Sequence, residues 1–403
     1  MRFLFLTQYF PPEVGAPQVR LAALARELVR NGHEVEVVTA LPNHPGGRVF
    51  PEYAQRLYVH EVWEGCSLHR VWMYAAQGTG AKRMLSYMSF TFTSLFGLLR
   101  SRRPDWIFVE SPPLFLSMTA WIASIFWESP FIFNVADLWP DSVKEMGVLR
   151  EGWLLRIAEH LEHWSYRKAR HVNAVTDGIR DVLIQKKGVP AGKITFLPNG
   201  VDTHLFESDT VDNALAQEFG LQGHKVIVYA GTIGFAQGLD VAIDAMALIQ
   251  PDHPEALLVF LGDGGERERL AKRVADEGIS NIRFIPPKPL EFVARLYTVA
   301  TAGFASLKDL PLFEGARPSK LFPIMASAKP VIYSGRGEGA RIVQEANAGW
   351  LVSPENSLAL ADAIRDLLTH PDLARTRGIS GRSYVTRNLS WPNLTRNWLE
   401  QIK

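Results

Sequence analysis

The chain has 403 residues, 47% of them hydrophobic, and its 43 Lys and Arg side chains nearly balance 42 Asp and Glu side chains. This length exceeds the roughly 250 to 300 residues at which a single core stops growing, so about two domains are expected. The balanced charge gives no reason to expect a nucleic-acid partner, and the single cysteine, Cys66, excludes an intrachain disulfide or a metal site of several thiolates. The N-terminal apolar run is too short for a signal peptide, which predicts a cytoplasmic protein.

The chain opens with a strand, a loop, a helix and a second strand. Residues 3–6 are apolar, residues 9–17 form a loop rich in Pro and Gly, and apolar residues then recur at helical spacing up to an Asn-Gly stop at residues 31–32. The second strand is expected at residues 33–39. This βαβ pattern places the loop at the carboxyl edge of a parallel sheet, where such folds bind ligands. Gly15 either lets a backbone approach a ligand closely or serves only the turn.

Residues 42–80 are rich in loops, and two alternating stretches, at residues 57–63 and 68–75, fit either strands or a lid. Residues 84–99 then predict a helix that is apolar almost all round and has cations on both sides. Such a helix either packs on a core or lies at a membrane surface. The apolar tract at residues 112–127 is too short to span a bilayer and is expected to pack inside the domain.

Two buried strands are predicted at residues 105–110 and 130–135, and the sequence ADLWPDS follows the second. Asp137 and Asp141 of this segment therefore lie at the carboxyl edge. A carboxylate there could orient a hydroxyl group or accept a proton, but aspartate is also a common helix cap. Helices and short strands over residues 153–206 complete the first domain.

A polar linker with a short helix, residues 206–222, leads into a second series of strands, loops and helices. Gly231, Gly234 and Gly264 fall at the carboxyl ends of predicted strands. Glycines on several strand ends favour a nucleotide-sized ligand, although each one alone fits a plain turn. The tail, residues 383–403, carries two tryptophans and is expected to pack across both domains.

The segment FEGARPSKLFPIMASAKPVIYSGRGEG, residues 313–339, concentrates cations and small residues between two predicted strands. Arg317, Ser319 and Lys320 precede a short helical run. A helix start with adjacent cations suits a phosphate group, because unpaired backbone N–H groups and charge-assisted hydrogen bonds both favour an anion. The alternative is that these cations are only solvated surface charges.

Four segments in order resemble glycosyltransferases of family 4: residues 9–47, DLWPDS, LPNGVD and PSKLFPIMASAKPV. The resemblance covers nearly the whole chain and is closest to the branch of bacterial O-antigen and capsule enzymes of the WbuB type. It implies a retaining reaction and the GT-B fold, with two Rossmann-like, doubly wound α/β domains facing a central cleft. On this reading residues 1–206 bind the acceptor, residues 207–382 bind the nucleotide sugar, and a helix in residues 383–403 returns to the first domain.

Two departures from the family pattern concern the donor's pyrophosphate. The family's glycine loop corresponds to residues 231–238, where many relatives have an Arg after the first glycine and a Lys before the last. This chain has Thr232 and Gln237 at these positions, and neither carries positive charge. By elimination, Arg317 and Lys320 become the candidate pyrophosphate ligands, helped by backbone N–H groups of the loop.

A third departure concerns the ribose. Pro323 stands where the family's ribose-binding glutamate is expected, and Ala328 replaces a usual glycine. Glu314 lies one residue out of register with the first glutamate of the family pair and is expected to contact the donor sugar, which leaves Glu338 as the candidate for the ribose. The remaining candidate donor contacts are Gly231, Thr232, Gly234, Gly264 and Ser319.

Retaining enzymes of this fold are commonly described as using front-face attack, in which the leaving phosphate takes the acceptor's proton. The protein must then position the reactants and stabilise the charge on the diphosphate. Lys320 and Arg317 are expected to carry the largest catalytic share, Asp137 to orient the acceptor hydroxyl or the sugar, and Glu13 with Gly15 to line the acceptor side. No DxD-type carboxylate pair lies on a suitable loop, so no metal or other cofactor is expected.

The sequence therefore predicts transfer of an N-acetylated sugar from a UDP-type donor to a lipid-linked saccharide in surface-polysaccharide synthesis, with peripheral contact at the cytoplasmic membrane. One alternative is a nucleotide-sugar epimerase of the same fold, which needs acid and base groups at the donor ring that the sequence does not offer. The other is an inactive nucleotide-sugar-binding partner subunit, suggested by Thr232, Gln237 and Pro323.

Overall fold

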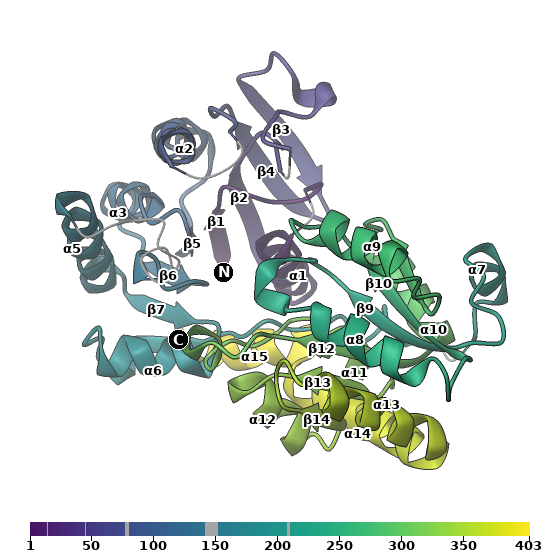
Figure 1. Ribbon diagram of the computed structural model, residues 1–403. Helices are drawn as coiled ribbons and strands as arrows, with labels where there is room; N and C mark the ends of the chain where they lie inside the picture. The colour runs from purple at the N-terminus through teal and green to yellow at the C-terminus, as the bar shows by residue number, and fades with distance from the viewer. Residues whose placement is uncertain (14, 45, 77–79, 142–151, 208–209) are drawn as a thin grey trace. The chain divides into compact units, whose positions relative to one another are not determined.

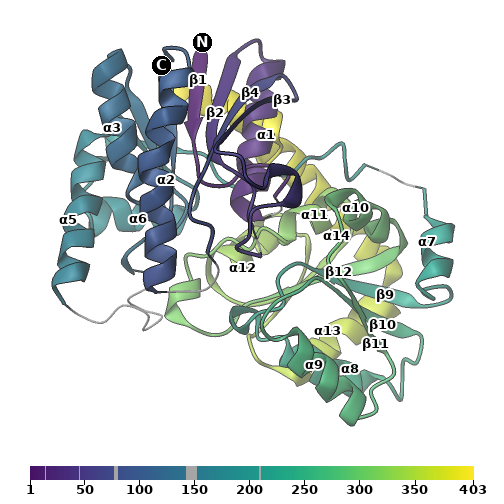
Figure 2. The same cartoon turned by 90° about the horizontal axis from the view of Figure 1, so that it is seen from above.

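Two α/β units make up the chain (Figures 1 and 2). The first unit consists of Met1–Asn199 with Leu394–Lys403, and the second of Gly200–Asn393. Each contains its own, almost entirely parallel sheet, which confirms the predicted class of two Rossmann-like domains. The computed structural model describes residues 1–13, 15–44, 46–76, 80–141, 152–207 and 210–403.

Both unit boundaries differ from those predicted at residues 206 and 383. Val201 and Phe206 are buried in the core of the second unit, so the chain has entered that unit before residue 206. At the other end, the Val201 N–H donates to the carbonyl oxygen of Leu389, which holds this part of the tail in the second unit. Only the residues from Leu394 onward belong to the first unit.

The sheet of the first unit has the strand order β3-β4-β2-β1-β5-β6-β7-β8. All neighbouring strands are parallel except β3 and β4, which form an antiparallel pair. The two stretches that fitted strands or a lid are thus strands. The strands are β1 (Arg2–Leu6), β2 (Glu34–Ala40), β3 (Tyr58–Trp63), β4 (Cys66–Val71), β5 (Trp106–Ser111), β6 (Phe131–Val135), β7 (His171–Ala174) and β8 (Ile194–Phe196).

Helices cover both faces of this sheet, because alternate residues of a strand point to opposite faces. Leu4 packs in one core with residues of α2 and α3, which lie side by side in Figures 1 and 2. On the other face, the fully buried Trp398 of α15 contacts Phe3 and Phe108. The helices are α1 (Ala16–Arg30), α2 (Ala81–Arg100), α3 (Leu116–Trp127), α5 (Trp153–Lys168), α6 (Asp177–Gln185) and α15 (Trp391–Gln401), with 3₁₀ turns η1 (Pro51–Tyr53) and η2 (Ala191–Lys193).

The prediction that residues 112–127 pack inside the domain is wrong for one face of α3. Leu116 and Ala120 are buried, but Ile125 and Phe126 are 59% and 72% exposed. The helix therefore has an apolar inner face and an apolar outer face, which a count of apolar residues along the chain cannot separate. None of the helices in the described part of the chain combines the length and the apolarity that crossing a bilayer requires.

The second unit has six parallel strands in the order β11-β10-β9-β12-β13-β14. Val226 and Val228 of β9 belong to one core, and Ile227 and Tyr229 to the other, so this strand is buried on both faces. This explains the continuous apolar runs of the sequence. The strands are β9 (Lys225–Ala230), β10 (Ala256–Leu261), β11 (Ile282–Ile285), β12 (Ala300–Ser306), β13 (Val331–Ser334) and β14 (Gly349–Val352).

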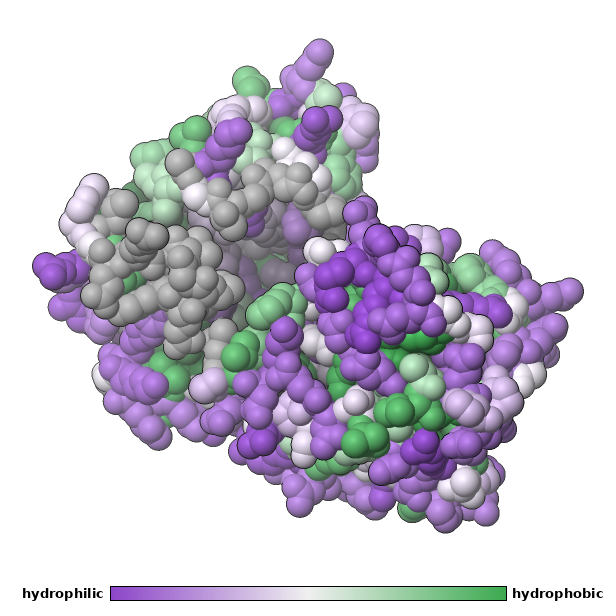
Figure 3. Space-filling view, viewed as in Figure 1, coloured by the Kyte–Doolittle hydropathy of each residue, from purple (hydrophilic) through white to green (hydrophobic). Residues whose placement is uncertain are grey.

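On the face seen in Figure 3, a strongly hydrophilic purple area of the second unit lies over α9. Two of its cations are compensated: Arg269 and Arg273 pair with Asp240 at 2.6 and 3.0 Å. The helices are α7 (Asn213–Glu218), α8 (Asp240–Ile249), α9 (Arg267–Asp276), α10 (Leu290–Val299), α11 (Leu321–Ala326), α12 (Gly337–Glu345), α13 (Ser357–Thr369) and α14 (Pro371–Asn388), with 3₁₀ turns η3 (Phe235–Gln237) and η4 (Pro311–Phe313).

Candidate functional site

The glycine loop, residues 231–238, follows β9 at the carboxyl edge of the second unit. Gly231 has a φ of +142°, and a Cβ there would lie 2.4 Å from Cε of Lys320. Gly264 has a φ of +154°, and its Cβ would lie 2.2 Å from the carbonyl oxygen of Ile233. Both positions require glycine, since a side chain would be strained by the backbone and blocked by these atoms. The structure thus brings Gly231, Lys320 and Gly264 to one place.

Hydrogen bonds hold the glycine loop in shape. The Tyr229 hydroxyl donates to the carbonyl oxygen of Thr232, and the Gly234 N–H donates to Oε1 of Gln237 at 3.1 Å. Gln237, which in the sequence is only a neutral residue in place of a cation, therefore closes the loop. Within the described chain, the backbone N–H groups of Thr232, Phe235 and Ala236 have no hydrogen-bond partner, and this leaves donors for an anion.

The Lys320 side chain crosses this loop. Its ammonium lies 5.5 Å from the ring centroid of Tyr229, and no described carboxylate pairs with it. Burial lowers the pKa of Lys320 to about 8, because the charged form loses hydration. A partly buried cation that has no counter-ion among the described residues is stabilised by an incoming anion, which makes Lys320 a candidate ligand for a negatively charged group.

Arg317 is placed differently from Lys320, although the two are three residues apart. Its Nε and Nη2 both lie 2.5 Å from Oε1 of Glu338, and the two side chains are only 7% and 3% exposed. The Glu338 N–H also donates to the carbonyl oxygen of Glu314 at 2.8 Å. The ion pair therefore joins the segment before α11 to the start of α12, and the geometry favours a positioning role for both residues. The Glu314 and Ser319 side chains are exposed on the same segment as Lys320.

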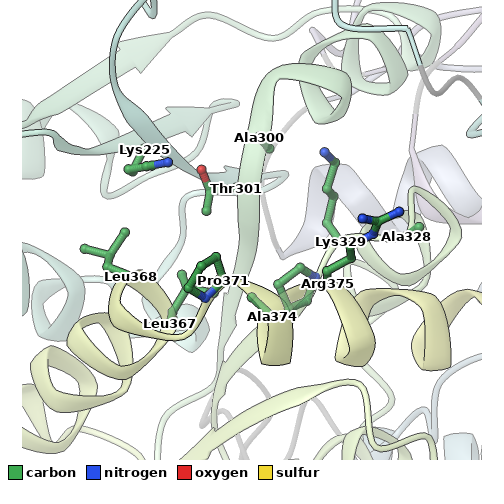
Figure 4. Close-up of a pocket in the computed structure, with 11 residues that line it drawn as sticks. Lys225, Ala300, Thr301, Ala328, Lys329, Leu367, Leu368, Pro371, Ala374 and Arg375 are labelled. Carbon is green, nitrogen blue, oxygen red and sulfur yellow. The ribbon is translucent and has the colours of Figure 1, made fainter.

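A cavity of about 250 Å³ lies elsewhere in this unit (Figure 4). Its lining includes Lys225 at the start of β9, Thr301 at the start of β12, and Lys329 just before β13. These positions are at the amino edge of the sheet, whereas the glycine loop is at the carboxyl edge. We therefore do not assign this cavity to the donor site.

In the first unit, Glu13 is buried and its carboxylate accepts three backbone N–H groups. The donors are Phe10 at 3.3 Å and Asn43 and His44, both at 2.8 Å. Glu13 thus ties the loop after β1 to the loop after β2, and burial raises the pKa of its carboxyl group despite these hydrogen bonds. Gly15 is in extended conformation and caps α1, so its backbone does not itself require glycine. Glu13 therefore holds the loops after β1 and β2 together through their backbone N–H groups.

A cluster of aromatic and cationic residues lies beside Glu13, and sequence reasoning missed it. The Arg83 guanidinium lies 5.7 Å from the ring centroid of Tyr9 and 4.9 Å from that of Tyr87, and the Tyr9 and His44 rings are 5.5 Å apart. Burial lowers the pKa of His44, and the Arg83 charge acts in the same direction. The only sequence signal was that Tyr9 and His44 belong to segments that carry the family resemblance.

The two aspartates after β6 differ in their surroundings. Asp137 is exposed directly after the strand, and its carbonyl oxygen accepts the Trp139 N–H at 2.9 Å. Asp141 pairs with Lys187 at 2.8 Å, and the same ammonium pairs with the buried Glu162 at 2.8 Å. Asp141 is therefore part of a structural ion-pair group, and Asp137 stays the candidate. In the described residues, no three His, Cys, Asp or Glu side chains are grouped to hold a metal ion.

A buried polar row crosses the first sheet and was also missed. Asn134 donates to Glu110 at 2.7 Å, Asn173 donates to Asn134 at 2.6 Å, and Thr195 donates to Asn173 at 2.9 Å. These four residues are partners in the register of β5 to β8. Arg20 of α1, which lies between the apolar positions of the helical pattern, is buried and pairs with Glu110. In the sequence, this row could have been recognised by the one polar residue near the end of each of these buried strands.

Two α/β units with parallel sheets, the second with a glycine loop and a lysine at the carboxyl edge of its strands, are the architecture of the GT-B class. The crystal structure of Anabaena HepE in complex with UDP and glucose has this fold, with a TM-score of 0.74 at 18% identity over 99% of this chain and 98% of that one. The family models agree in order and extent. A glycosyl transferase 4-like domain matches residues 15–200, and a glycosyl transferases group 1 domain matches residues 212–383.

The chain therefore belongs to the glycosyltransferases that combine these two domains, and it is an enzyme of that class. It is 26% identical over its whole length to the putative colanic acid biosynthesis glycosyl transferase WcaI of Escherichia coli, of which it covers 100%. It is 23% identical to the probable glycosyltransferase WbjE of Pseudomonas aeruginosa, over 72% of each chain.

Proposed function

We propose that this glycosyltransferase moves an N-acetylated sugar from a UDP-type nucleotide sugar to a lipid-linked saccharide during the synthesis of a surface polysaccharide, with retention of configuration. The role in polysaccharide synthesis is supported by the name of WcaI, which matches the whole chain, and by the resemblance of four segments to the WbuB-like branch. The choice of a UDP-linked donor is supported by the same resemblance and by HepE, whose structure holds UDP and glucose.

The observation that carries the proposal is the Lys320 ammonium beside Gly231, which has no carboxylate partner among the residues that the structure describes. A departing nucleoside diphosphate gains negative charge in the transition state, and a preorganised cation in a dry site stabilises that charge without reorganisation. The N–H groups of Thr232, Phe235 and Ala236, which have no partner in the described part of the chain, add donors at the same loop. In this proposal protein groups compensate the diphosphate charge, so transfer should persist in the presence of a chelator.

The other residues have supporting roles in this proposal. The Arg317–Glu338 pair holds the segment that carries Lys320 and Glu314, and Glu314 contacts the donor sugar from its exposed position. In the first unit, Asp137 orients the acceptor hydroxyl, and Glu13 keeps the acceptor-side loops in place. The leaving phosphate takes the proton, so no side chain has to act as a nucleophile.

A panel of nucleotide sugars tests the donor. UDP-linked N-acetylated hexosamines should raise the melting temperature of the protein more than the GDP- or ADP-linked sugars, because a ligand that binds only the native state stabilises it. The same donors should be slowly hydrolysed without acceptor. Binding without any hydrolysis or transfer would instead support the inactive partner subunit, and a change of the donor sugar into its epimer would support the epimerase.

We further propose that the enzyme reaches its lipid-linked acceptor at the inner face of the cytoplasmic membrane through the α2–α3 face. This face consists of apolar side chains that are at least two-fifths exposed and recur at helical spacing on α2 and α3. Soluble proteins rarely expose a continuous apolar surface of this kind without a partner. Its residues are Leu85, Phe92, Phe96, Leu99, Met118, Ile122, Ile125 and Phe126.

The charge around the α2–α3 face suits an anionic lipid surface. The sequence has no acidic residue between Glu64 and Asp105, whereas Lys82 and Arg100 are exposed at the two ends of α2. Apolar side chains that enter the headgroup region and cations that stay at its surface are the pattern of an interfacial helix. The structure therefore supports both readings of residues 84–99, since α2 packs on the core with one face and is apolar on the other.

Sedimentation with vesicles tests this face. The protein should co-sediment with vesicles of phosphatidylcholine and phosphatidylglycerol, less so at high salt, and the double variant Phe92→Glu/Phe126→Glu should stay in the supernatant. Leu358→Glu is the matched control, because Leu358 is 67% exposed on α13 in the second unit. Equal sedimentation of the double variant and the control would contradict a role of this face.

A further inference from the structure

One lysine is not enough charge for a nucleoside diphosphate, and most other cations near the glycine loop already have acidic partners. Arg269 and Arg273 pair with Asp240, Arg317 pairs with Glu338, and Arg336 pairs with Asp309 at 3.3 Å. Cations paired in this way contribute little field at the carboxyl edge of β9. A second uncompensated cation is therefore the chemical requirement that this edge has to meet.

Lys308 meets this requirement. It follows the end of β12, which pairs with β9, so it lies at the same edge of the sheet as the glycine loop. Its backbone N–H donates to the carbonyl oxygen of Ala236 at 3.0 Å, and its Cγ would lie 2.8 Å from a Cβ at Gly238. Its ammonium lies over the ring of Phe235, 3.5 Å from the centroid. No described carboxylate pairs with Lys308.

The two lysines thus approach opposite ends of one loop. Lys320 crosses Gly231 at its beginning, and Lys308 crosses Gly238 at its end. Between them are the N–H groups of Thr232, Phe235 and Ala236 that have no partner in the described chain. Phe235 is 65% exposed, and its contact keeps the Lys308 ammonium at the loop rather than free in solvent.

We propose that Lys308 is the second cation of the donor site and binds the diphosphate of the nucleotide sugar together with Lys320. This inference rests on the proposed donor chemistry and adds a residue to it from another strand end. Lys308 lies beside the exposed Phe235 ring, and a bound diphosphate is charged there before and after transfer. In this proposal its charge serves donor binding, while Lys320 at Gly231 serves the step in which charge develops.

The test is calorimetric titration of the full-length protein with UDP. Lys308→Met keeps an unbranched stem over Gly238 and removes only the charge, and UDP binding should weaken roughly 10- to 100-fold, the range for a hydrogen bond to a charged group. Inorganic diphosphate should lose its ability to compete with UDP by a similar factor. Lys308→Arg should restore most of the affinity, and Lys225→Ala, at the amino edge of the same sheet, should bind UDP like the wild type.

The outcomes separate this inference from the donor proposal. UDP binding that Lys308→Met leaves unchanged would overturn the role of Lys308, whatever Lys320 does. A wild-type protein that binds neither UDP nor inorganic diphosphate would overturn the donor proposal itself. Weaker UDP binding in both Lys308→Met and Lys308→Arg, together with a lowered melting temperature, would show that Lys308 only packs the loop, and this too would overturn the inference.

Discussion

Lys320→Ala should lower the turnover of sugar transfer by roughly 100- to 1,000-fold, the range observed when one preorganised donor to a developing negative charge is removed. The Michaelis constant for the donor should change much less, because the ammonium meets charge that grows on the leaving diphosphate in the transition state. Steady-state kinetics with the donor and a lipid-linked or synthetic acceptor measure both quantities. If Lys320 were only a surface lysine, its replacement by alanine would change neither the turnover nor the Michaelis constant.

The fold of this variant should be intact. Lys320 is partly buried and has no acidic partner in the described chain, so removing its charge should keep or raise the melting temperature. Lys272→Ala, an exposed lysine on α9, is the control for loss of a charge alone. Near-wild-type kinetics of Lys320→Ala would refute the assignment of this residue as the catalytic cation.

The pH dependence gives an independent check on Lys320. Burial lowers its pKa to about 8, so in the free enzyme the charged form is lost as the pH rises through that value. The ratio kcat/KM, which reports the free enzyme, should therefore fall about tenfold per pH unit above pH 8. Lys320→Arg should be less active, but its kcat/KM should not fall above pH 8, because the guanidinium stays charged. If kcat/KM of Lys320→Arg still falls above pH 8, another titrating group causes the fall.

Glu338→Ala should destabilise the second unit by about 3 kcal/mol or more, because it leaves the Arg317 charge buried without its partner. For a unit of this size, such a loss lowers the melting temperature by roughly 6 to 12 °C. Calorimetry or thermal denaturation followed by fluorescence measures it. If the pair were a pair of surface charges, the change would be close to zero.

A double variant separates positioning from direct contact with the donor. Arg317→Met/Glu338→Leu replaces both charges with apolar side chains of similar size and should recover most of the melting temperature. If the pair only positions the segment before α11, turnover should recover with stability. A stable double variant with turnover as low as Lys320→Ala would show that Arg317 or Glu338 contacts the donor, as the sequence comparison predicted.

Local pattern was enough to predict the fold class and to single out the segments of the proposed donor site. The alternation of apolar runs and helical periodicity predicted two doubly wound units, because parallel strands buried on both faces appear as continuous apolar segments such as β9 and β10. Glycines at strand ends marked the loop at Gly231. The segment around Lys320 was found by its cations, and the helix at residues 84–99 by its length and its high apolar content.

Local pattern could not predict which side chains contact each other in the folded chain. Arg317 and Lys320 are equivalent candidates in the sequence, yet one is neutralised by Glu338, 21 residues later, and the other meets Tyr229 from β9. Arg20 and Glu110, 90 residues apart, form a buried pair, and Glu13 accepts N–H groups from the loop after β2. Lys308 reaches the glycine loop only because β12 pairs with β9.

The sequence by itself determined the two α/β units, the glycine loop and a set of charged candidates, because these depend on periodicity and on residue type. The tertiary structure alone decided which of those charges are compensated and which are available to a ligand. The physical reason is that the free energy of a charge depends on its burial and on its neighbours within a few ångström, and residues far apart in the chain supply those neighbours.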